Sequence, residues 1–550
     1  MAYAQDTTLL NPSLIETDAP QPKISQGGDG PAFSVQRPNL APDNAETVTF
    51  EYQSLSLIGA NAIAPERLYA LWPFTIGEMV TVADIFSLAD EITNLYRSEG
   101  YALSFALVPA QQIEAGTITI EVIEGRLDTL NIQTKWLPKR TEAHIETAFQ
   151  KLAAEVPTTI TSLERYLLLV NDLPGITARG VISPGQSDSA SSLTLIVEET
   201  PFTGSFGYND YLSDALENDL LSIGLTANNI FTGRDSFTID ASRSPKSEIF
   251  QNLSTNYETY LNDDGLFLRL AASESSTKPK KGTLAASGFE SNAQTQTAEI
   301  RKVWLRSRSE NLYLGGIITN ANSTSKNAGS VTSEDKTLTV SAYADYDTNL
   351  SGSRKLAAKF LIESGLDAFN ARGNSRQFAR VDYQLAGVDG QMTGRIALPF
   401  KNATLNSLDA DLSFKLRQMI SDHPVLAGAE CSFGGPSYGS GFESGALSGE
   451  NCALASFKLR WNQVLTGSDM LANGILQYFA RLDAGYVSQQ GQLTAGETRN
   501  QNAASWGVGA TLILKNGLSL AVERSLQLKN SDEPNQEGKG KTNFRMSYTY

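Results

Sequence analysis

The chain of 550 residues carries a formal net charge of −16, and its mean hydropathy is −0.22. The acidic balance argues against a nucleic-acid partner, because nucleic-acid phosphates are bound by basic surfaces. The sequence has no apolar stretch of about eighteen residues, so it predicts no membrane-spanning helix, and its length predicts several domains.

Residues 1–47 are predicted to be a flexible N-terminal arm, because they are rich in Pro, Asp, Asn, Gln and Gly and lack a sustained helical or strand period. At most a short helix is expected over Thr8–Glu16, since a proline lies inside it. The tripeptide Ala2-Tyr3-Ala4 has the small-x-small form of a signal-peptidase site, so we expect a removed export signal and a mature chain that starts at Gln5. A chance match in a polar tail is the alternative.

A compact α/β unit is predicted over residues 48–125. Its main helix covers Val82–Arg97, where apolar residues form one stripe at helical spacing, and Gly100 follows as a C-terminal stop. Two strands come next, Leu103–Val108 and Thr117–Ile123, and the second has apolar residues at alternate positions. A strand and a short helix are expected before the main helix.

Residues 126–200 are predicted to repeat this order. A strand and a helix open the unit, and a second helix is expected to start at a capping box formed by Thr161 and Glu164. Strands over Thr177–Ile182 and Ser192–Glu198 close the unit. Two consecutive units with the order β-α-α-β-β form an internal repeat, which limits the choice of architectures.

Residues 201–550 are predicted to form a transmembrane antiparallel β-barrel, so the fold class is mostly β. They read as short alternating strands that end on the aromatic Tyr550, and a closed barrel leaves no unpaired backbone edge in lipid. At roughly 22 residues per strand with its connection, about 350 residues predict about sixteen strands. A soluble sandwich or propeller is the alternative, but no blade-length repeat occurs.

Three local patterns refine the expected barrel. Asn516-Gly517 predicts a two-residue hairpin between neighbouring strands. Gln377–Leu385 is predicted to be a barrel strand, whereas the polar segment Ser323–Asp335 is predicted to be a mobile loop.

Cys431 and Cys452 are the only two cysteines of the chain. In an oxidising periplasm an isolated pair that flanks one Gly/Ser-rich loop is a disulfide candidate. Closing such a loop contributes about 3 kcal/mol in the chain-entropy model. The alternative is that the two residues are unrelated small apolar side chains.

No enzymatic site is predicted, and no cofactor or metal is implied. The two histidines, His144 and His423, belong to no cluster with metal-ligand spacing, and no nucleophile elbow occurs. Gly540-Lys541-Thr542 resembles the end of a phosphate-binding loop, but Asn535 stands where the earlier glycine would be required.

Several stretches together resemble the TpsB-type transporters of two-partner secretion, which belong to the POTRA-barrel superfamily. Leu95–Gly125 and Leu167–Gly185 look like a first and a second POTRA domain, and Asn228–Ile239 (NNIFTGRDSFTI) is similar to an early barrel hairpin. Phe433–Asn451 is similar to extracellular loop 6, and Leu454–Trp461 is similar to the strand that follows this loop. Leu482–Val487 (LDAGYV) is similar to the Asp-x-Gly strand element that loop 6 contacts. The resemblance covers nearly everything after residue 48.

The resemblance implies two periplasmic POTRA domains, residues 48–125 and 126–200, that capture an unfolded exoprotein of TpsA type. The barrel, a monomer among the lipids of the bacterial outer membrane, would pass this partner to the cell surface. Loop 6, near residues 431–453, would fold back into the lumen and hold the resting barrel closed, and a plug helix would lie in the N-terminal arm. A barrel-assembly insertase is the alternative, although such proteins usually have more POTRA units; a small-solute porin would leave residues 48–200 unexplained.

The tip of loop 6 departs from the family pattern. Where the family reads Val-Arg-Gly-Tyr or Val-Arg-Gly-Phe, this chain has Gly439, Ser440, Gly441 and Phe442, so the loop arginine is absent. The acid of the Asp-x-Gly element remains as Asp483, followed by Gly485, and Arg481 lies on the same face of the strand as a candidate partner. We therefore expect the loop to be held less by an ion pair than by packing of Phe442 and by the disulfide.

A POTRA unit exposes a strand edge beside a helix, and an extended client can add to this edge as another strand. The candidate substrate groove in the first unit consists of Leu95, Tyr96, Leu103, Phe105 and Leu107. The alternative is that these apolar residues only fill the core.

Overall fold

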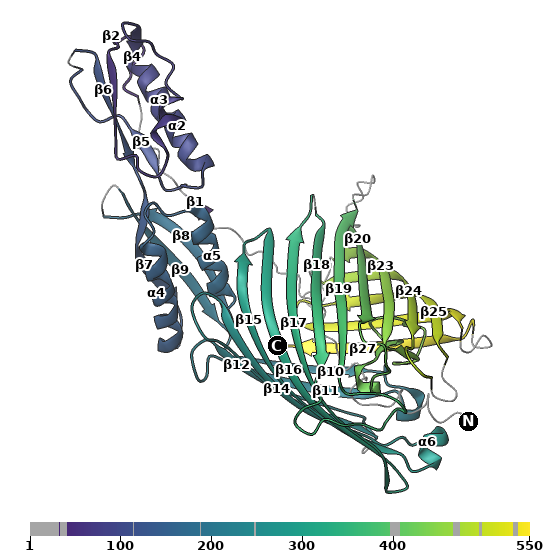
Figure 1. The fold of residues 1–550 in the computed structure, drawn as a ribbon. Coiled ribbons are helices and arrows are strands. Elements are labelled where there is room, and N and C mark those ends of the chain that lie inside the picture. The colour runs from purple at the N-terminus through teal and green to yellow at the C-terminus, as the bar shows by residue number, and fades with distance from the viewer. Residues whose placement is uncertain are drawn as a thin grey trace.

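The computed structural model describes residues 32–33, 41–113, 115–186, 189–246, 249–351, 353–396, 407–465, 474–493, 498–531 and 537–550. Two α/β units stand in a row at one end of a large closed barrel (Figure 1). The short helix expected near the N-terminus and the signal-peptidase tripeptide lie outside the described residues. Among the described residues, no helix is long and apolar enough to cross a membrane.

The first α/β unit contains a three-stranded sheet of order β3-β6-β5, with β6 parallel to β3 and antiparallel to β5. Its elements are β2 (Thr49–Glu51), β3 (Ser54–Ile58), α2 (Pro65–Tyr69), β4 (Met79–Thr81), α3 (Val82–Ser98), β5 (Phe105–Leu107) and β6 (Thr117–Ile123). Helix α3 starts in a capping box, in which the Thr81 hydroxyl accepts a hydrogen bond from the Asp84 N–H at 3.1 Å and the Asp84 carboxylate accepts one from the Thr81 N–H at 2.9 Å. The apolar stripe of α3, with Ile85, Leu88 and Ile92, is buried in the core of this unit.

The second α/β unit repeats the order of a strand, two helices and two strands. Its elements are β7 (Arg126–Thr134), α4 (Lys139–Ala153), α5 (Ile160–Asn171), β8 (Ile176–Pro184) and β9 (Ala190–Glu199). The capping box expected at Thr161 is wrong, because Thr161 already lies inside α5. The N-cap is Thr159, which has the extended backbone that a cap requires and accepts a hydrogen bond from the Ser162 N–H at 3.1 Å.

The outer edge of β8 is covered by the chain itself. A short strand from the N-terminal arm, β1 (Ala32–Phe33), pairs in parallel with Val181 and Ile182 of β8, which gives the sheet order β1-β8-β9-β7. Further along β8, the side-chain amide of Asn171 donates to the Ala178 carbonyl and accepts from the Ala178 N–H, both at 2.9 Å. Exposed strand edges invite pairing with other chains, so both contacts blunt this edge.

The barrel is closed by sixteen strands, as the sequence predicts, and each is antiparallel to its neighbours. The strands are β10 (Phe202–Asn209), β11 (Leu220–Asn228), β12 (Asp235–Arg243), β13 (Phe250–Tyr260), β14 (Leu266–Thr277), β15 (Glu290–Arg306), β16 (Glu310–Asn327), β17 (Ser330–Asn349), β18 (Lys355–Gly365), β19 (Tyr383–Ile396), β20 (Ser407–Met419), β23 (Asn451–Val464), β24 (Ile475–Ser488), β25 (Asn500–Ile513), β26 (Leu518–Asn530) and β27 (Gly540–Thr549). Closure is made by β10 and β27, with Ser205 opposite Thr549 and Asn209 opposite Arg545.

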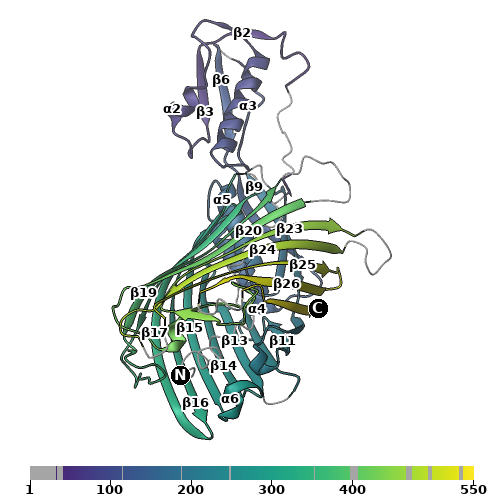
Figure 2. The ribbon, with the colours of Figure 1, turned by 90° about the vertical axis from the view of Figure 1, so that its right-hand side faces the viewer.

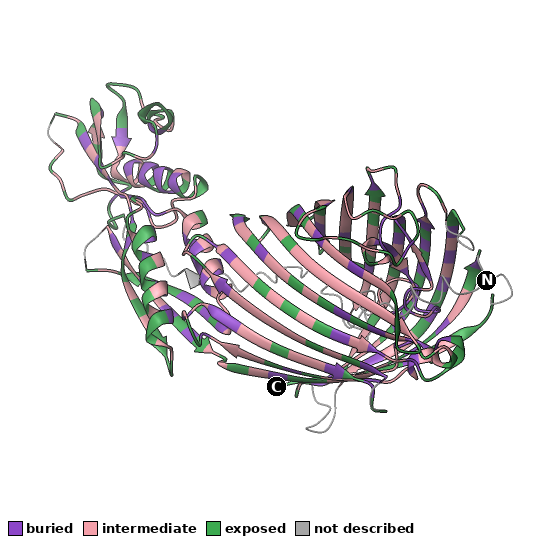
Figure 3. Ribbon diagram, turned by 60° about the horizontal axis from the view of Figure 1, so that its bottom comes forward, coloured by how far each residue is buried: buried purple, intermediate pink, exposed green. Residues whose placement is uncertain are grey.

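Polar side chains point into the barrel and apolar ones point outward, which is the reverse of a soluble protein. Along β24, Leu482 and Tyr486 are exposed, whereas Arg481 and Asp483 are buried inside. Figure 3 shows exposed and less exposed residues alternating along the strands. This alternation is typical of a transmembrane barrel and explains why its strands escape detection by mean hydropathy.

Two expected elements of the barrel are wrong. The segment Ser323–Asp335, expected as a loop, extends β16 and β17 into a long hairpin that turns at Ala328 and Gly329; Figure 2 shows β16 reaching the end of the barrel away from the first α/β unit. The segment Gln377–Leu385, expected as a strand, joins β19 only from Tyr383 onward.

Strand β10 starts directly at the second α/β unit, so the strands run alternately away from this unit and back toward it. We call the barrel end beside this unit the near end and the other the far end. Three connections at the far end matter below: loop 5 (residues 366–382), loop 6 (residues 420–450) and loop 7 (residues 489–499).

Candidate functional site: loop 6 inside the barrel

Loop 6 turns back into the barrel after β20. Its stem consists of two short antiparallel strands, β21 (Cys431–Phe433) and β22 (Leu447–Gly449). Its tip, residues 434–446, is hydrogen-bonded to inward-facing side chains of β24, β25, β26 and β27. Stem and tip therefore occupy part of the lumen.

Asp483 receives the tip of the loop. Its carboxylate is completely buried and accepts hydrogen bonds from the Ser440 N–H at 2.9 Å and from the Ser440 hydroxyl at 3.1 Å. The hydroxyl of Ser505 donates to the same oxygen at 3.3 Å, and the hydroxyl of Ser525 lies 2.9 Å from that of Ser440. The loop thus offers the acid only neutral groups, because its tip carries serine where the family has arginine.

The cation that pairs with Asp483 comes from the barrel wall. Arg481 Nε donates to the other carboxylate oxygen of Asp483 at 2.7 Å, and its guanidinium also donates to the carbonyls of Pro436 (at 2.5 Å) and Ser437 in the loop. Both charged residues face inward because they are two positions apart on β24. The structure therefore brings Arg481, Asp483 and the loop tip together, with the ion pair contained in a single strand.

Two glycines of the tip are required by close contacts. The Gly441 N–H donates to the Ser505 hydroxyl at 3.4 Å, and a Cβ at position 441 would lie 2.9 Å from the Ser505 side chain. Gly439 has a φ of +93°, and a Cβ there would lie 2.7 Å from the ring of Phe433. A side chain at either position would push the tip away from the wall.

An aromatic pair fixes the loop above Gly485. The rings of Phe433 and Phe442 lie edge to face with centroids 5.5 Å apart, and both side chains are buried. A Cβ at Gly485 would lie 2.3 Å from the Phe433 ring, so this glycine leaves the space that the ring fills. Phe433 was not among the residues predicted for this site, although an aromatic residue directly before Gly434-Gly435 was a usable signal.

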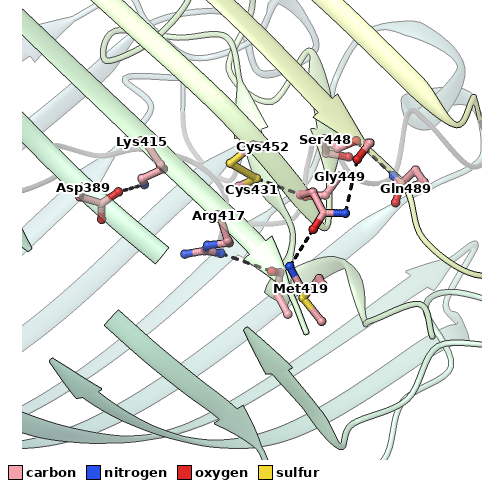
Figure 4. The surroundings of a disulfide bond; sticks show 12 residues. Asp389, Lys415, Arg417, Met419, Cys431, Ser448, Gly449, Cys452 and Gln489 are labelled. Carbon is pink, nitrogen blue, oxygen red and sulfur yellow. Dashed lines mark hydrogen bonds and ion pairs between the residues drawn. A yellow bond between two sulfur atoms is a disulfide. The ribbon is translucent and has the colours of Figure 1, made fainter. Parts of the chain in front are cut away.

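Cys431 and Cys452 are joined by a disulfide that ties the incoming side of the stem to the start of β23. Figure 4 shows this bond together with neighbouring contacts of Arg417 and Gln489. Arg417 donates to the Ala429 carbonyl at 3.4 Å, so the wall also contacts the loop just before the stem.

The five residues predicted as a substrate groove do not form one surface. Tyr96 is completely buried and its hydroxyl donates to Glu124 at 2.9 Å, so it belongs to the core of the first unit. Leu95 packs against the same core, whereas Leu103 packs against the core of the second unit. Of the five, only Phe105 and Leu107 lie on β5, an outer strand of its sheet, and both side chains are half-buried.

The second α/β unit is fastened to the near end of the barrel by charged groups. Arg306, at the end of β15, donates to both carboxylate oxygens of Asp172 at 2.7 and 2.8 Å, and its side chain is almost fully buried. Next to it, the Arg308 N–H donates to Glu164 at 2.6 Å. These contacts fix the direction in which the two units leave the barrel.

Comparison with known proteins agrees with this architecture. Residues 50–125 match the family model of the ShlB-type POTRA domain, and residues 190–512 match that of the haemolysin secretion/activation protein ShlB/FhaC/HecB. The structure is similar to that of CdiB from Escherichia coli, with a TM-score of 0.74 over 96% of this chain and 94% of that chain; at 17% identity this likeness concerns the fold alone.

Two curated relatives are similar in sequence. The chain is 24% identical over 271 residues to the heme/hemopexin transporter protein HuxB of Haemophilus influenzae (strain 86-028NP), which covers 48% of this chain and 46% of that protein. It is 27% identical over 195 residues to the outer membrane transporter CdiB of Escherichia coli O6:K15:H31, which covers 35% of this chain and 30% of that protein. The matched regions thus span less than half the length of either relative.

The ShlB/FhaC/HecB model covers more than half of the chain, and it overlaps the barrel and the loop described above. The POTRA region in front of the barrel is periplasmic in this family, and the barrel lies in the outer membrane. The chain belongs to the ShlB/FhaC/HecB family of haemolysin secretion/activation proteins, the TpsB-type outer-membrane transporters of two-partner secretion.

Proposed function

We propose that this protein captures an unfolded exoprotein with its POTRA region and secretes it through the barrel to the cell surface. The observation that carries the proposal is a loop that occupies part of the lumen and whose tip contributes only neutral groups to its contacts with the wall, in a chain of the two-partner secretion family. The barrel-assembly insertase is not favoured, because the family matched over residues 190–512 is one of secretion proteins. The transporter acts as a monomer surrounded by outer-membrane lipids.

Capture takes place by strand addition to the POTRA units, residues 48–125 and 126–200. The outer strand β5, and strand β8 once β1 is displaced from it, are the edges at which an extended client can pair, and side chains such as Phe105 and Leu107 provide selection. The parallel pairing of β1 with β8 supports this mode of binding, since an extended segment already adds to one of these edges.

Passage requires the tip of loop 6 to leave the lumen. Each neutral hydrogen bond between the tip and the wall contributes about 0.5–1.5 kcal/mol, and each bond to the charged Asp483 or Arg481 contributes about 1.5–3 kcal/mol. We expect a binding client to offset this energy. Asp483 keeps Arg481 as its partner when the tip leaves, so opening does not leave a buried carboxylate without a cation.

The test compares the proteins that cells release with and without this transporter. A strain that lacks the gene is complemented with the full chain or with a variant that lacks residues 48–200, and the culture supernatants are analysed by mass spectrometry. We expect a large secreted protein to disappear with the gene, to return with the full chain and to stay absent with the variant. A supernatant that does not depend on the gene, together with a variant that still conducts ions, would identify a porin instead.

A further inference from the structure

The base of loop 6 is held by a second group of buried polar residues, which we call the clasp: Arg376, Glu430, Glu450 and Gln489. Arg376 comes from loop 5 and donates to Glu430 at 3.1 Å, to Glu450, and to the side-chain carbonyl of Gln489 at 3.0 Å. All four residues are less than 10% exposed. The clasp lies at the far end of the barrel and joins loops 5, 6 and 7.

The clasp contacts both sides of loop 6. Glu430 directly precedes β21 and Glu450 directly follows β22, so the guanidinium of Arg376 connects the beginning of the stem to its end. In addition, Gln489 of loop 7 donates to the Ser448 carbonyl at 3.1 Å, and the Gln490 N–H donates to Glu450 at 2.8 Å. The disulfide joins the same two sides of the loop through Cys431, directly after Glu430, and Cys452, two positions after Glu450.

The base and the tip of loop 6 are therefore held by different kinds of contact. Two buried carboxylates at the base pair with the same arginine, and a buried acid that loses its cation is strongly disfavoured. The tip contributes only neutral groups to its contacts with the wall, and the charged residues that it contacts, Arg481 and Asp483, remain paired with each other when the tip exchanges these bonds for water.

Glycines stand at both junctions between stem and tip. Gly434 and Gly435, at the start of the tip, have φ angles of +118° and +96°, and Gly445, near its end, has a φ of +75°. Glycine reaches both halves of backbone conformational space without a steric penalty, so these junctions can change direction while the stem stays in place.

We propose that Arg376 is a positioning residue that fixes the base of loop 6 to loops 5 and 7, so that only the tip, residues 434–446, leaves the lumen when the barrel opens. The movement of the tip rests on the proposed export function, whereas the role of Arg376 in the resting barrel does not.

The first experiment measures single-channel conductance in planar lipid bilayers for Arg376→Gln, Arg376→Lys, and a variant that lacks residues 436–442. The control is Arg372→Gln, because Arg372 lies in the same loop and pairs with Glu334 at 3.2 Å on the surface. Heat-modifiable migration in detergent gels selects folded barrels. We expect the variant that lacks residues 436–442 to form a steady open pore, and Arg376→Gln to have an open fraction at least tenfold higher than the wild type. Arg376→Lys should restore part of the closed fraction, and Arg372→Gln should behave like the wild type. A folded Arg376→Gln barrel with the wild-type open fraction would overturn the proposal.

The second experiment separates the base from the tip by electron paramagnetic resonance distance measurements. Spin labels are placed on introduced cysteines at Ser330, in the far-end hairpin, and either at Gly428 in the base or at Ser437 in the tip; the two native cysteines are bonded to each other. Replacing Ser440 and Gln527 by alanine should broaden only the distances to the tip, whereas Arg376→Gln should broaden those to the base. Base distances that broaden in the tip variant, or stay narrow in Arg376→Gln, would contradict the proposal. Failure of the secretion test alone would leave these distances unchanged and would refute only the export function.

Discussion

Asp483 is the buried charge around which loop 6 is organised, and its cation lies on the same strand. Opposite charges two positions apart on one face of β24 stay together whatever the loop does. The tip can therefore leave without separating an ion pair, unlike a tip that carries the arginine itself.

Removing Arg481 alone should destabilise the barrel much more than removing Arg481 and Asp483 together. In Arg481→Met the buried Asp483 is left without a cation, which we expect to lower the free energy of unfolding by about 3–5 kcal/mol. The double variant with Asp483→Asn should recover most of this loss. Urea unfolding in lipid vesicles, followed by tryptophan fluorescence, measures both; additive losses would contradict the pairing.

Glu443 makes the seating of the tip sensitive to pH. Burial raises the pKa of Glu443 above its ordinary value of 4.5, and the N–H of Asp214 lies 3.3 Å from it as a donor. A raised pKa means that the seated loop favours the protonated acid, so its stabilisation is complete at low pH and is lost as pH rises through the raised pKa. We expect the open fraction of single channels to fall as the pH is lowered from neutral toward the ordinary pKa of 4.5. Glu443→Gln should be mostly closed across this range, and an unchanged pH dependence in this variant would rule the residue out.

Gly485 provides the space for the aromatic pair. In Gly485→Ala the new methyl group would meet the ring of Phe433 at 2.3 Å, and overpacking of this kind costs about 1–3 kcal/mol. We expect the tip to be displaced and the conductance of single channels to rise. Gly387→Ala is the matched control, because its Cβ would meet only the Leu416 carbonyl at 3.4 Å.

At the scale of elements, sequence periodicity predicts the helices and strands that have one apolar and one polar face. Helix α3 and strand β6 were predictable because each buries one face. The hairpin over Ser323–Asp335 was missed because polar residues occupy both of its faces at the far end, which removes the alternation. Gln377–Leu385 has alternating apolar residues, but Arg376 and Arg380 tie that segment to the base of loop 6, an arrangement that depends on residues far away in the sequence.

In the candidate site too, the sequence predicts local neighbours but not contacts between residues that are far apart in the chain. Arg481 and Asp483 were predictable as neighbours because two positions on one strand always share a face. The contacts of Phe433 with Gly485 and of Ser525 with Ser440 were not predictable, because they depend on how deep loop 6 enters the barrel. Tyr96 was assigned to a groove although it is buried, since helical spacing alone does not tell which side of a stripe meets the core.

The disulfide stabilises loop 6, an element of the barrel, by restricting the conformations of the unfolded loop. Replacing Cys431 and Cys452 by serine should lower the stability of the loop by about 3 kcal/mol in the chain-entropy model. We expect the clasp to keep the base in place, so hydrogen exchange should increase within loop 6 and stay slow in β23. Rapid exchange in β23 as well would show that the bond supports the wall rather than the loop.

At the scale of the whole molecule, the direction of the POTRA region depends on the junction between Asp172 and Arg306. Asp172→Asn removes the carboxylate that pairs with the buried arginine, and we expect the second unit to loosen from the barrel at a cost of about 3–5 kcal/mol. Limited proteolysis of the near-end turns measures this loosening. Lys151→Gln is the control, because the Lys151 side chain is exposed and each of its pairs with Asp263 and Asp264 contributes about 0–1 kcal/mol. Equal cleavage of both variants would contradict the role of the junction.

The pairing of β1 with β8 makes the two POTRA edges unequal for any incoming chain. Because β1 belongs to the same polypeptide, it competes for that edge as a tethered ligand, with an effective concentration on the order of millimolar. A client captured by strand addition, as proposed, would reach β8 only by displacing this competitor, so its apparent affinity for β8 would be reduced in proportion. The outer edge of β5 has no strand beside it among the described residues, and there the full intrinsic affinity is available.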